Sequence, residues 1–244
     1  MRRHIAGWHS PRLNKWMDIV TYGHYGPALL LFPTAAADYL EYERFQLIES
    51  LRPFIDAGKL KVYSINSINT ESWMNNQMHP RHKAERQETF NHYIYDEVVP
   101  YIFNDCGGHT PIILSGASFG ALHSANIFFK RPDLFWGLIA MSGDYQLHSY
   151  TKGYSDDLTF FNSPLSYLPG WHDHNIINQL KNKQIVLATG QGNFEKPSAA
   201  IELSHVLNAK EVHNNLEVWG HDIHHDWPTW RQMLPHFIGN YFVH

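Results

Sequence analysis

The chain has 244 residues, of which 43% are hydrophobic, and a single cysteine, Cys106. This length can bury a large core without disulfides, and the hydrophobic fraction excludes a disordered chain. Charged residues make up only 17% and the formal net charge is −4, so we expect no basic face for nucleic acid or for an anionic membrane surface.

No linker-like stretch divides the chain, and we predict one domain over residues 1–244. No apolar run approaches the roughly 20 residues that a bilayer requires. The basic residues at the start are not followed by an apolar run, so we expect no secretory signal. With its unpaired cysteine, the chain is expected to be cytoplasmic. Both a monomer and a homo-oligomer stay open.

The apolar runs, taken in chain order, alternate with helical patterns. Residues 16–22 alternate in polarity and predict an edge strand, and short apolar runs predict buried strands at 28–32, 60–65, 111–115, 138–141, 184–188 and 215–219. Helical spacing of apolar residues predicts helices at 39–57, 82–104, 121–130, 198–210 and 227–242. This alternation predicts the α/β class, with a mostly parallel sheet and helices on both faces.

The strongest local signal is Gly116-Ala117-Ser118-Phe119-Gly120, which follows a predicted strand and precedes a predicted helix. In such a strand-turn-helix context the G-x-S-x-G pattern forms a tight turn that exposes the serine hydroxyl at the carboxyl edge of the sheet. The flanking glycines let neighbouring backbone pass without Cβ clashes. Ser118 is therefore the predicted nucleophile.

A nucleophilic serine needs a base that is oriented by a third group, and here the expected chain order is serine, acid, histidine. Three histidines, His221, His224 and His225, lie in the loop after the last predicted strand, where the base should be. The loop after the preceding strand, residues 190–197, carries one carboxylate, Glu195. Glu195 is the predicted acid, and the alternatives are a solvated pair with Lys196 or a charge at a helix N-terminus.

The oxyanion of an acyl-transfer intermediate needs two backbone N–H donors. We expect one from Phe119, the residue after the nucleophile. The other is expected from Ala35, in the loop of small residues that follows the strand at 28–32. In the same loop, Asp38 is placed to cap the next helix.

The chain resembles the putative esterase group of serine α/β-hydrolases, which includes esterase D, feruloyl esterases and mycolyltransferases. The resemblance extends over nearly the whole chain, and its segments are residues 10–13, 22–26, 31–34, 72–73, 116–120, 135–143 and 225–231. In relatives the catalytic histidine directly precedes Asp-Trp-Pro, as His225 does here. The resemblance therefore implies His225 as base and Ser118 as nucleophile. The histidine loop is longer than usual, and Glu195 stands where relatives often have Asp.

The same residues allow other interpretations. His221, His224 and His225 with Asp222 and Asp226 could bind zinc, but Gly220 and Pro228 indicate a loop and no H-E-x-x-H motif is present, so no metal is predicted. The long aromatic segment at 145–174 is expected to build a substrate pocket or to pack as a surface excursion. Trp73 and His221 are further candidates for substrate contact, with a core role for Trp73 as the alternative.

Together these features predict a serine esterase that cleaves a small-molecule carboxylic ester through an acyl-enzyme and needs no cofactor. Two rival hypotheses remain open. One is an acyltransferase that passes the acyl group to an alcohol, and the other is a non-catalytic binding protein on the same fold.

Overall fold

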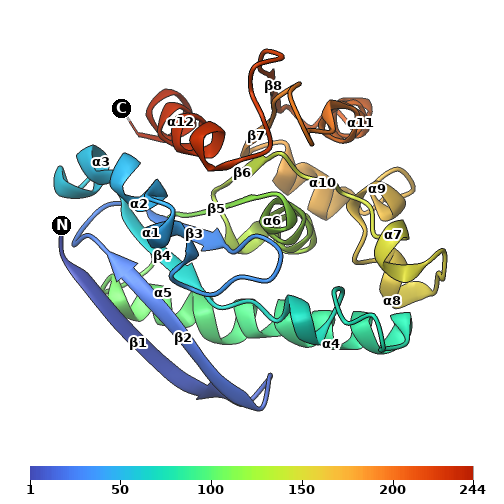
Figure 1. The fold of residues 1–244 in the computed structure, drawn as a ribbon, viewed down its shortest axis with the longest axis horizontal. Helices are drawn as coiled ribbons and strands as arrows, with labels where there is room; N and C mark the ends of the chain where they lie inside the picture. The colour runs from blue at the N-terminus through green and yellow to red at the C-terminus, as the bar shows by residue number, and fades with distance from the viewer. Residues whose placement is uncertain (244) are drawn as a thin grey trace.

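The computed structural model describes residues 1–243, in which eight strands form one sheet in the order β1-β2-β4-β3-β5-β6-β7-β8 (Figure 1). The strands β1 and β2 form an antiparallel hairpin, and β2 pairs antiparallel with β4. All the other neighbours are parallel. The strands are β1 (Arg3–Ser10), β2 (Lys15–Tyr22), β3 (Ala28–Phe32), β4 (Lys61–Ile65), β5 (Ile112–Ala117), β6 (Gly137–Met141), β7 (Gln184–Thr189) and β8 (Asn215–Val218).

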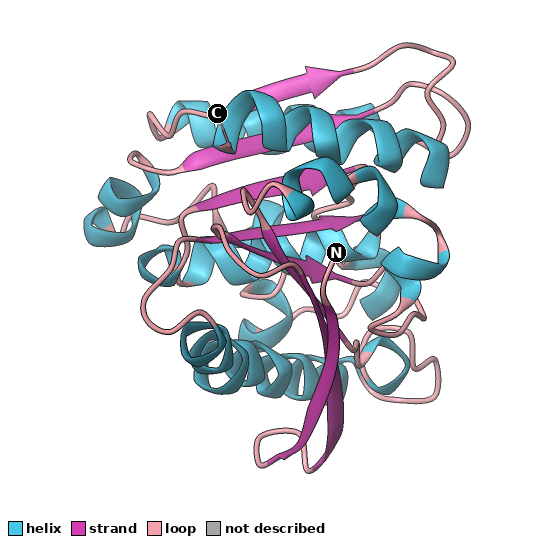
Figure 2. Ribbon diagram, turned by 90° about the vertical axis from the view of Figure 1, so that its left-hand side faces the viewer, coloured by secondary structure: helices cyan, strands magenta, loops and turns pink. Residues whose placement is uncertain are grey.

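Helices cover both faces of the sheet (Figure 2). The long helices are α4 (Pro80–Tyr93), α6 (Phe119–Lys130), α11 (Pro197–Ala209) and α12 (Trp227–Phe237). The shorter ones are α1 (Glu41–Arg44), α2 (Leu47–Ser50), α3 (Arg52–Asp56), α5 (Val99–Asp105), α7 (His148–Thr151), α8 (Asp157–Phe160), α9 (Pro164–Tyr167) and α10 (His174–Leu180). A π-helical turn, Ile94–Val98, joins α4 to α5, and a second one, Ile238–Phe242, continues α12.

The central strands are apolar along their whole length because both of their faces are covered. Every residue of β3, β4, β5 and β6 is buried. One core cluster lies between the sheet and α4, α5, α6 and α11, and a second lies between the opposite face and α1, α2, α3 and α12. The predicted α/β-hydrolase sheet with helices on both faces is confirmed.

Two element predictions were wrong in detail. The run at 16–22 forms β2, which lies inside the sheet, whereas the edge strand is β1. The helix predicted over 39–57 is three short helices, because Gln46 adopts a left-handed conformation with φ of 61° and ends the first of them. The 145–174 segment holds α7, α8 and α9 and the start of α10.

The sheet order defines where a ligand would bind. The strand β3 pairs with β4 on one side and with β5 on the other. After β3 the chain continues to the neighbour on one side, and after β4 it crosses to the other side, so the strand order reverses at β3. In open α/β sheets the crevice at the carboxyl ends of such strands is where ligands bind. The loops that follow β3 and β5 therefore border the candidate site.

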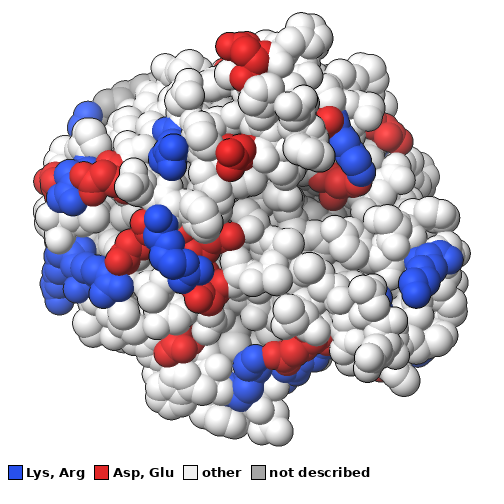
Figure 3. All heavy atoms as spheres, viewed as in Figure 1, with Lys and Arg blue, Asp and Glu red and all other residues white. Residues whose placement is uncertain are grey.

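Basic and acidic side chains alternate in small groups on the face shown in Figure 3, with no large area of one sign. This agrees with the small net charge of −4. Within residues 1–243, none of the helices has the length and apolar character needed to cross a bilayer.

Candidate active site

Ser118 lies at the turn between β5 and α6, with φ of 56° and ψ of −119°. A positive φ at a non-glycine residue is strained, costs on the order of 1–3 kcal/mol, and tends to occur at functional sites. The backbone N–H of Ser118 donates to the carbonyl of Met141 at 2.9 Å, which holds the turn against the end of β6. The turn thus presents the Ser118 side chain at the carboxyl edge of the sheet.

The two glycines of the motif are required by close packing. A Cβ on Gly116 would lie 2.4 Å from the backbone of Gly120, and a Cβ on Gly120 would lie 2.2 Å from the carbonyl oxygen of Phe32. These distances are below any real Cβ contact. Only glycine therefore lets α6 start directly against the end of β3, which brings the loop after β3 beside Ser118.

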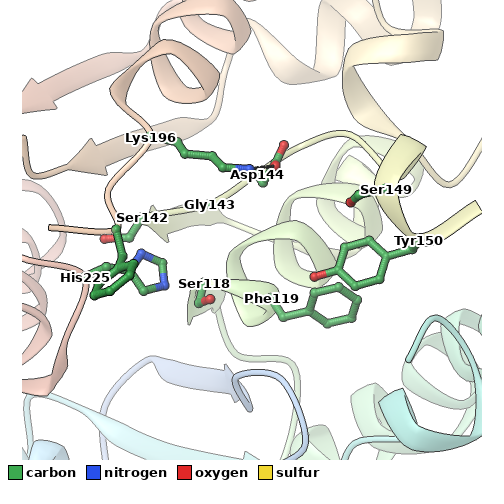
Figure 4. Close-up of a pocket in the computed structure, with 10 residues that line it drawn as sticks. Ser118, Phe119, Ser142, Gly143, Asp144, Ser149, Tyr150, Lys196 and His225 are labelled. Atoms are coloured by element: carbon green, nitrogen blue, oxygen red, sulfur yellow. Dashed lines mark hydrogen bonds and ion pairs between the residues drawn. The ribbon is translucent and has the colours of Figure 1, made fainter. Parts of the chain in front are cut away.

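A cavity of about 250 Å³ opens over Ser118 (Figure 4). His225 lines it, and the His225 ring extends from its loop toward Ser118 (Figure 4). The rings of Phe119, Tyr150 and Phe194 form apolar walls, and Ser142, Asp144 and Lys196 supply polar groups. The cavity is therefore a mixed apolar and polar pocket around one hydroxyl and one imidazole, as expected of an ester-binding site.

Glu195 is held as a buried carboxylate beside His225. Its side chain is fully buried, and Oε2 lies 3.9 Å from Nδ1 of His225. Ser142 Oγ donates to Oε1 at 2.6 Å, and Thr189 Oγ1 lies 2.9 Å from Oε2. Burial raises the pKa of Glu195, but His225 and the Ser142 and Thr189 hydroxyls stabilise the charged form more strongly, so the pKa falls below its ordinary value. Glu195 is therefore ionised at neutral pH.

Lys196 does not pair with Glu195, which was one of the two alternatives for this carboxylate. Its Nζ pairs instead with Asp144 at 2.8 Å, at the rim of the cavity (Figure 4). The pairing leaves Glu195 to the hydroxyls and to His225.

The loops that carry Glu195 and His225 are joined by backbone hydrogen bonds. Gly192 N donates to the carbonyl of Ile223 at 2.8 Å, and His225 N donates to the carbonyl of Asn193 at 3.0 Å. His224 accepts from the N–H of Asn193 through Nδ1 at 2.9 Å. His224 thus points toward the acid loop and joins the two loops, while His225 faces the cavity.

The predicted oxyanion donors lie at the start of α6 and in the loop after β3. Phe119 is the first residue of α6, where a backbone N–H has no partner within the helix. Ala35 packs against the apolar cluster that contains Phe119 and Leu122. Within residues 1–243, neither Ala35 nor Phe119 donates its backbone N–H to a protein acceptor. Both N–H groups therefore lack a protein partner; Phe119 lines the cavity over Ser118, whereas Ala35 is not among its lining residues.

Two residues predicted to contact substrate lie outside the cavity. Trp73 is 1% exposed and packs in the cluster with Phe119 and Leu147, behind the cavity wall. Its large apolar ring is better accommodated in the core, the alternative stated above. His221 is exposed, follows Trp219 and Gly220 after the end of β8, and does not line the cavity. No group of three or more metal-ligating side chains occurs within residues 1–243.

Several site residues escaped the sequence reasoning. Ser142 accepts from Trp230 Nε1 at 3.0 Å and donates to Glu195, and it has a φ of 52° at the carboxyl end of β6. Its position before Gly143, directly after a predicted strand, was the available signal. Tyr150 comes from the aromatic segment 145–174, for which a pocket was one of the two expectations, and it does line the cavity. Phe194 precedes the acid, and nothing in the spacing of the sequence singled out its ring.

Known structures share this fold. The chain aligns with a ferulic acid esterase at 17% identity and a TM-score of 0.76, covering 96% of this chain and 95% of that one. It aligns with an S-formylglutathione hydrolase from Staphylococcus aureus at 17% identity and a TM-score of 0.70, covering 98% and 97%. MPT51 of Mycobacterium tuberculosis gives 12% identity and a TM-score of 0.72, covering 98% and 97%. At these identities the likeness shows the fold alone.

Sequence comparison supplies the family. No curated protein matches the chain in sequence. The family model described as Putative esterase matches residues 62–240, which include the nucleophile turn, the acid loop and the histidine loop. The chain therefore belongs to the putative esterase family of carboxylic-ester hydrolases.

Proposed function

We propose that the protein hydrolyses a small carboxylic ester with Ser118 as nucleophile, His225 as general base and Glu195 as the orienting acid. The observation that carries the proposal is the convergence of three chain segments on one cavity. Ser118 is held at a strained turn, His225 lines the same cavity, and the buried carboxylate of Glu195 lies 3.9 Å from Nδ1 of the imidazole. A serine, an imidazole and a carboxylate with these relations form the arrangement that activates a hydroxyl.

In the proposed mechanism, Ser118 Oγ attacks the ester carbonyl carbon and its proton passes to Nε2 of His225. Glu195 faces Nδ1, so it fixes the ring orientation and stabilises the imidazolium. The N–H groups of Phe119 and Ala35 hold the oxyanion. His225 then gives the proton to the departing alkoxide oxygen, which leaves an acyl ester on Ser118. Water attacks this ester, its proton passes to His225, and the same proton returns to Ser118 as the acid is released.

The cavity supports a compact substrate. Its volume of about 250 Å³ is below the roughly 300–1,000 Å³ of pockets that enclose drug-sized ligands. Phe119 and Tyr150 meet edge to face, with ring centroids 4.9 Å apart, and offer an apolar wall to an acyl or aryl group. The paired Lys196 and Asp144 at the rim place opposite charges together, so the rim has no net charge to select a strongly ionic group.

The direct test is a panel of acetyl, butyryl and feruloyl esters and S-formylglutathione, assayed with the wild type and with Ser118→Ala. Hydrolysis of a short acyl ester that disappears in the variant supports the proposal. Adding a primary alcohol separates hydrolysis from transfer, because a transferase would form the new ester in preference to the free acid. Hydrolysis that is unchanged in Ser118→Ala would overturn the assignment of the nucleophile.

A further inference from the structure

The buried side chain of Asn69 hydrogen-bonds to the backbone of the loop that carries Ala35. Asn69 lies in a single 3₁₀ turn, Asn69–Glu71, that follows β4, and it is 1% exposed. Its Nδ2 donates to the carbonyl oxygen of Thr34 at 3.1 Å and also to the carbonyl oxygen of Ala35. Two successive peptide groups of the loop thus share one amide donor.

Peptide geometry turns these two bonds into a constraint on the N–H groups. In a planar trans peptide the N–H of one residue points opposite to the C=O of the residue before it. Fixing the carbonyls of Thr34 and Ala35 toward Asn69 therefore points the N–H groups of Ala35 and Ala36 away from Asn69. Within residues 1–243, neither of these N–H groups has a protein acceptor. Donors that are oriented in advance and left unpaired are what an oxyanion requires.

The orientation of the Asn69 amide is itself determined by a second buried residue. Asn69 Oδ1 lies 2.7 Å from Nε2 of His123, which is 4% exposed. A flipped amide would place Oδ1 against two carbonyl oxygens, so Nδ2 must face the loop and Oδ1 must accept from His123. Burial lowers the pKa of His123 to about 3, so the ring is neutral and its single proton is on Nε2.

The loop has a further anchor that leaves Asn69 as the group controlling Ala35. Glu41, 6% exposed, accepts the backbone N–H of Thr34 at 2.8 Å and also the Thr34 hydroxyl. That contact fixes the start of the loop. His123 belongs to α6, the helix that begins directly after Ser118, so the nucleophile and the oxyanion loop are fixed to the same helix.

We propose that Asn69 is a positioning residue for catalysis: by holding the carbonyls of Thr34 and Ala35, it orients the Ala35 peptide N–H toward the oxyanion, with His123 fixing its amide. This inference rests on the proposed function of the Ser118 site. Asn69 touches no reacting atom and acts only through the backbone of the loop.

The test compares Asn69→Leu, which keeps the number and branching of the side-chain heavy atoms but cannot donate, with Asn126→Leu as a matched control. Asn126 is a 3% exposed asparagine on α6 whose Nδ2 donates to Asn162 Oδ1 at 2.9 Å, and it makes no hydrogen bond to the oxyanion loop. Two quantities are measured for folded protein: kcat and KM for 4-nitrophenyl acetate, and the affinity for an aliphatic trifluoromethyl ketone. The ketone forms a tetrahedral adduct on serine that carries an oxyanion, so its affinity reports the donors without turnover.

We expect Asn69→Leu to lower kcat about 10- to 100-fold, less than the 10²–10³-fold cost of deleting a donor outright, because the N–H remains but loses its orientation. KM should stay within about threefold, and ketone affinity should fall in parallel with kcat. Asn126→Leu should lower thermal stability and leave both quantities unchanged. His123→Leu provides a second variant should Asn69→Leu not fold. It frees the Asn69 amide to rotate and should cost about three- to tenfold in kcat, as expected for one buried hydrogen bond.

An Asn69→Asp variant gives a pH signature that a general packing defect would not produce. The ionised carboxylate cannot donate to the two carbonyls, whereas the protonated acid can donate once. The ratio of variant to wild-type kcat/KM should therefore rise as the pH is lowered. Wild-type ketone affinity in Asn69→Leu, or an equal loss in Asn126→Leu, would overturn the inference. A wild type that neither hydrolyses esters nor binds the ketone would instead contradict the proposed function, and the inference with it.

Discussion

The two ends of the sheet both carry a cavity and a cluster of ionisable side chains. They differ in whether the polar groups there have hydrogen-bond or ion-pair partners. At the amino ends of β3, β4 and β5 a cavity of about 420 Å³ is lined by Lys61, Asp105, Cys106 and two histidines. The cavity over Ser118 at the carboxyl ends is smaller, about 250 Å³. Volume alone would therefore favour the amino end over the proposed site.

At the amino end the charged and hydroxyl groups pair with one another. Lys61 Nζ lies 2.8 Å from Asp105 Oδ2, and Tyr63 OH donates to the same carboxylate at 2.8 Å. At the carboxyl end, Ser118 Oγ and the N–H groups of Phe119 and Ala35 have no hydrogen-bond acceptor or donor within residues 1–243. Strained, unpaired and oriented groups therefore distinguish a reactive site from a structural cluster better than cavity size does.

The largest expected difference between the two ends of the sheet is the effect of removing Ser118 at the carboxyl end or Cys106 at the amino end. Ser118→Ala should lower kcat/KM for 4-nitrophenyl acetate by roughly 10³-fold or more, because no other hydroxyl occupies the turn. Cys106→Ala at the amino end should leave kcat/KM within twofold, roughly the error of such an assay. Equal losses in the two variants would erase the distinction.

His225→Ala should be about as damaging as loss of Ser118, since nucleophile and base act as a unit. His221→Ala should retain turnover because His221 is exposed and outside the cavity. His224→Ala should also retain measurable turnover with a modest loss, because His224 joins the acid and base loops through Asn193. The check is kcat/KM of the three variants at pH 8. A greater loss in His221→Ala than in His225→Ala would reassign the base.

Glu195→Gln should lower kcat by roughly 10²- to 10³-fold. This loss is smaller than that expected for Ser118→Ala and His225→Ala and larger than that expected for His221→Ala and His224→Ala. The lowered pKa of Glu195 also determines the sign of its pH dependence. The ionised form is favoured in the folded protein, so its contribution to stability is full above the ordinary carboxyl pKa and is lost as the pH falls through the folded value. The kcat of both proteins tests the first expectation, and urea unfolding of both at several pH values tests the second. A variant with wild-type kcat would remove Glu195 from the mechanism.

The smallest expected effect is at the amino end. Asp105→Asn should destabilise the fold by about 1 kcal/mol, because Lys61 then stays largely buried without its counter-charge, and should leave kcat unchanged. Burial raises the pKa of Asp105, but Lys61 and Tyr63 lower it further than burial raises it. The stability gap to wild type should therefore be constant above about pH 5 and shrink below about pH 4. Urea unfolding at several pH values measures this gap, and a loss of kcat in a folded variant would contradict the structural role.

The sequence was sufficient for the parts of the fold that burial dictates. The strands β3 to β7 are apolar because they are covered on both faces, so their runs stood out without a structure. The strand β1 was missed because most of its residues are exposed or half-buried and form no apolar run. The break at Gln46 was missed because helical spacing continues across it, and a single left-handed residue leaves no mark in the apolar pattern.

The same contrast holds for the site. Ser118 was predictable because the local strand-turn-helix constraint is encoded in adjacent residues. His225 and Glu195 were inferred from chain order, and the structure brings both to the Ser118 cavity or its wall. The hydrogen bonds of Ser142 to Glu195 and of Asn69 to Thr34 could not be found this way, because they join residues 53 and 35 positions apart in the chain. Such contacts arise from the tertiary fold and have no spacing signature.

The most direct test of the central claim is to locate the adduct of a fluorophosphonate probe by peptide mass spectrometry, with competition by the ester substrate. The structure predicts one stoichiometric adduct on Ser118, abolished in Ser118→Ala, strongly slowed in His225→Ala and unaffected by Cys106→Ala. An adduct on another residue, or an absence of labelling in a preparation that hydrolyses esters, would contradict the assignment of Ser118 as the nucleophile.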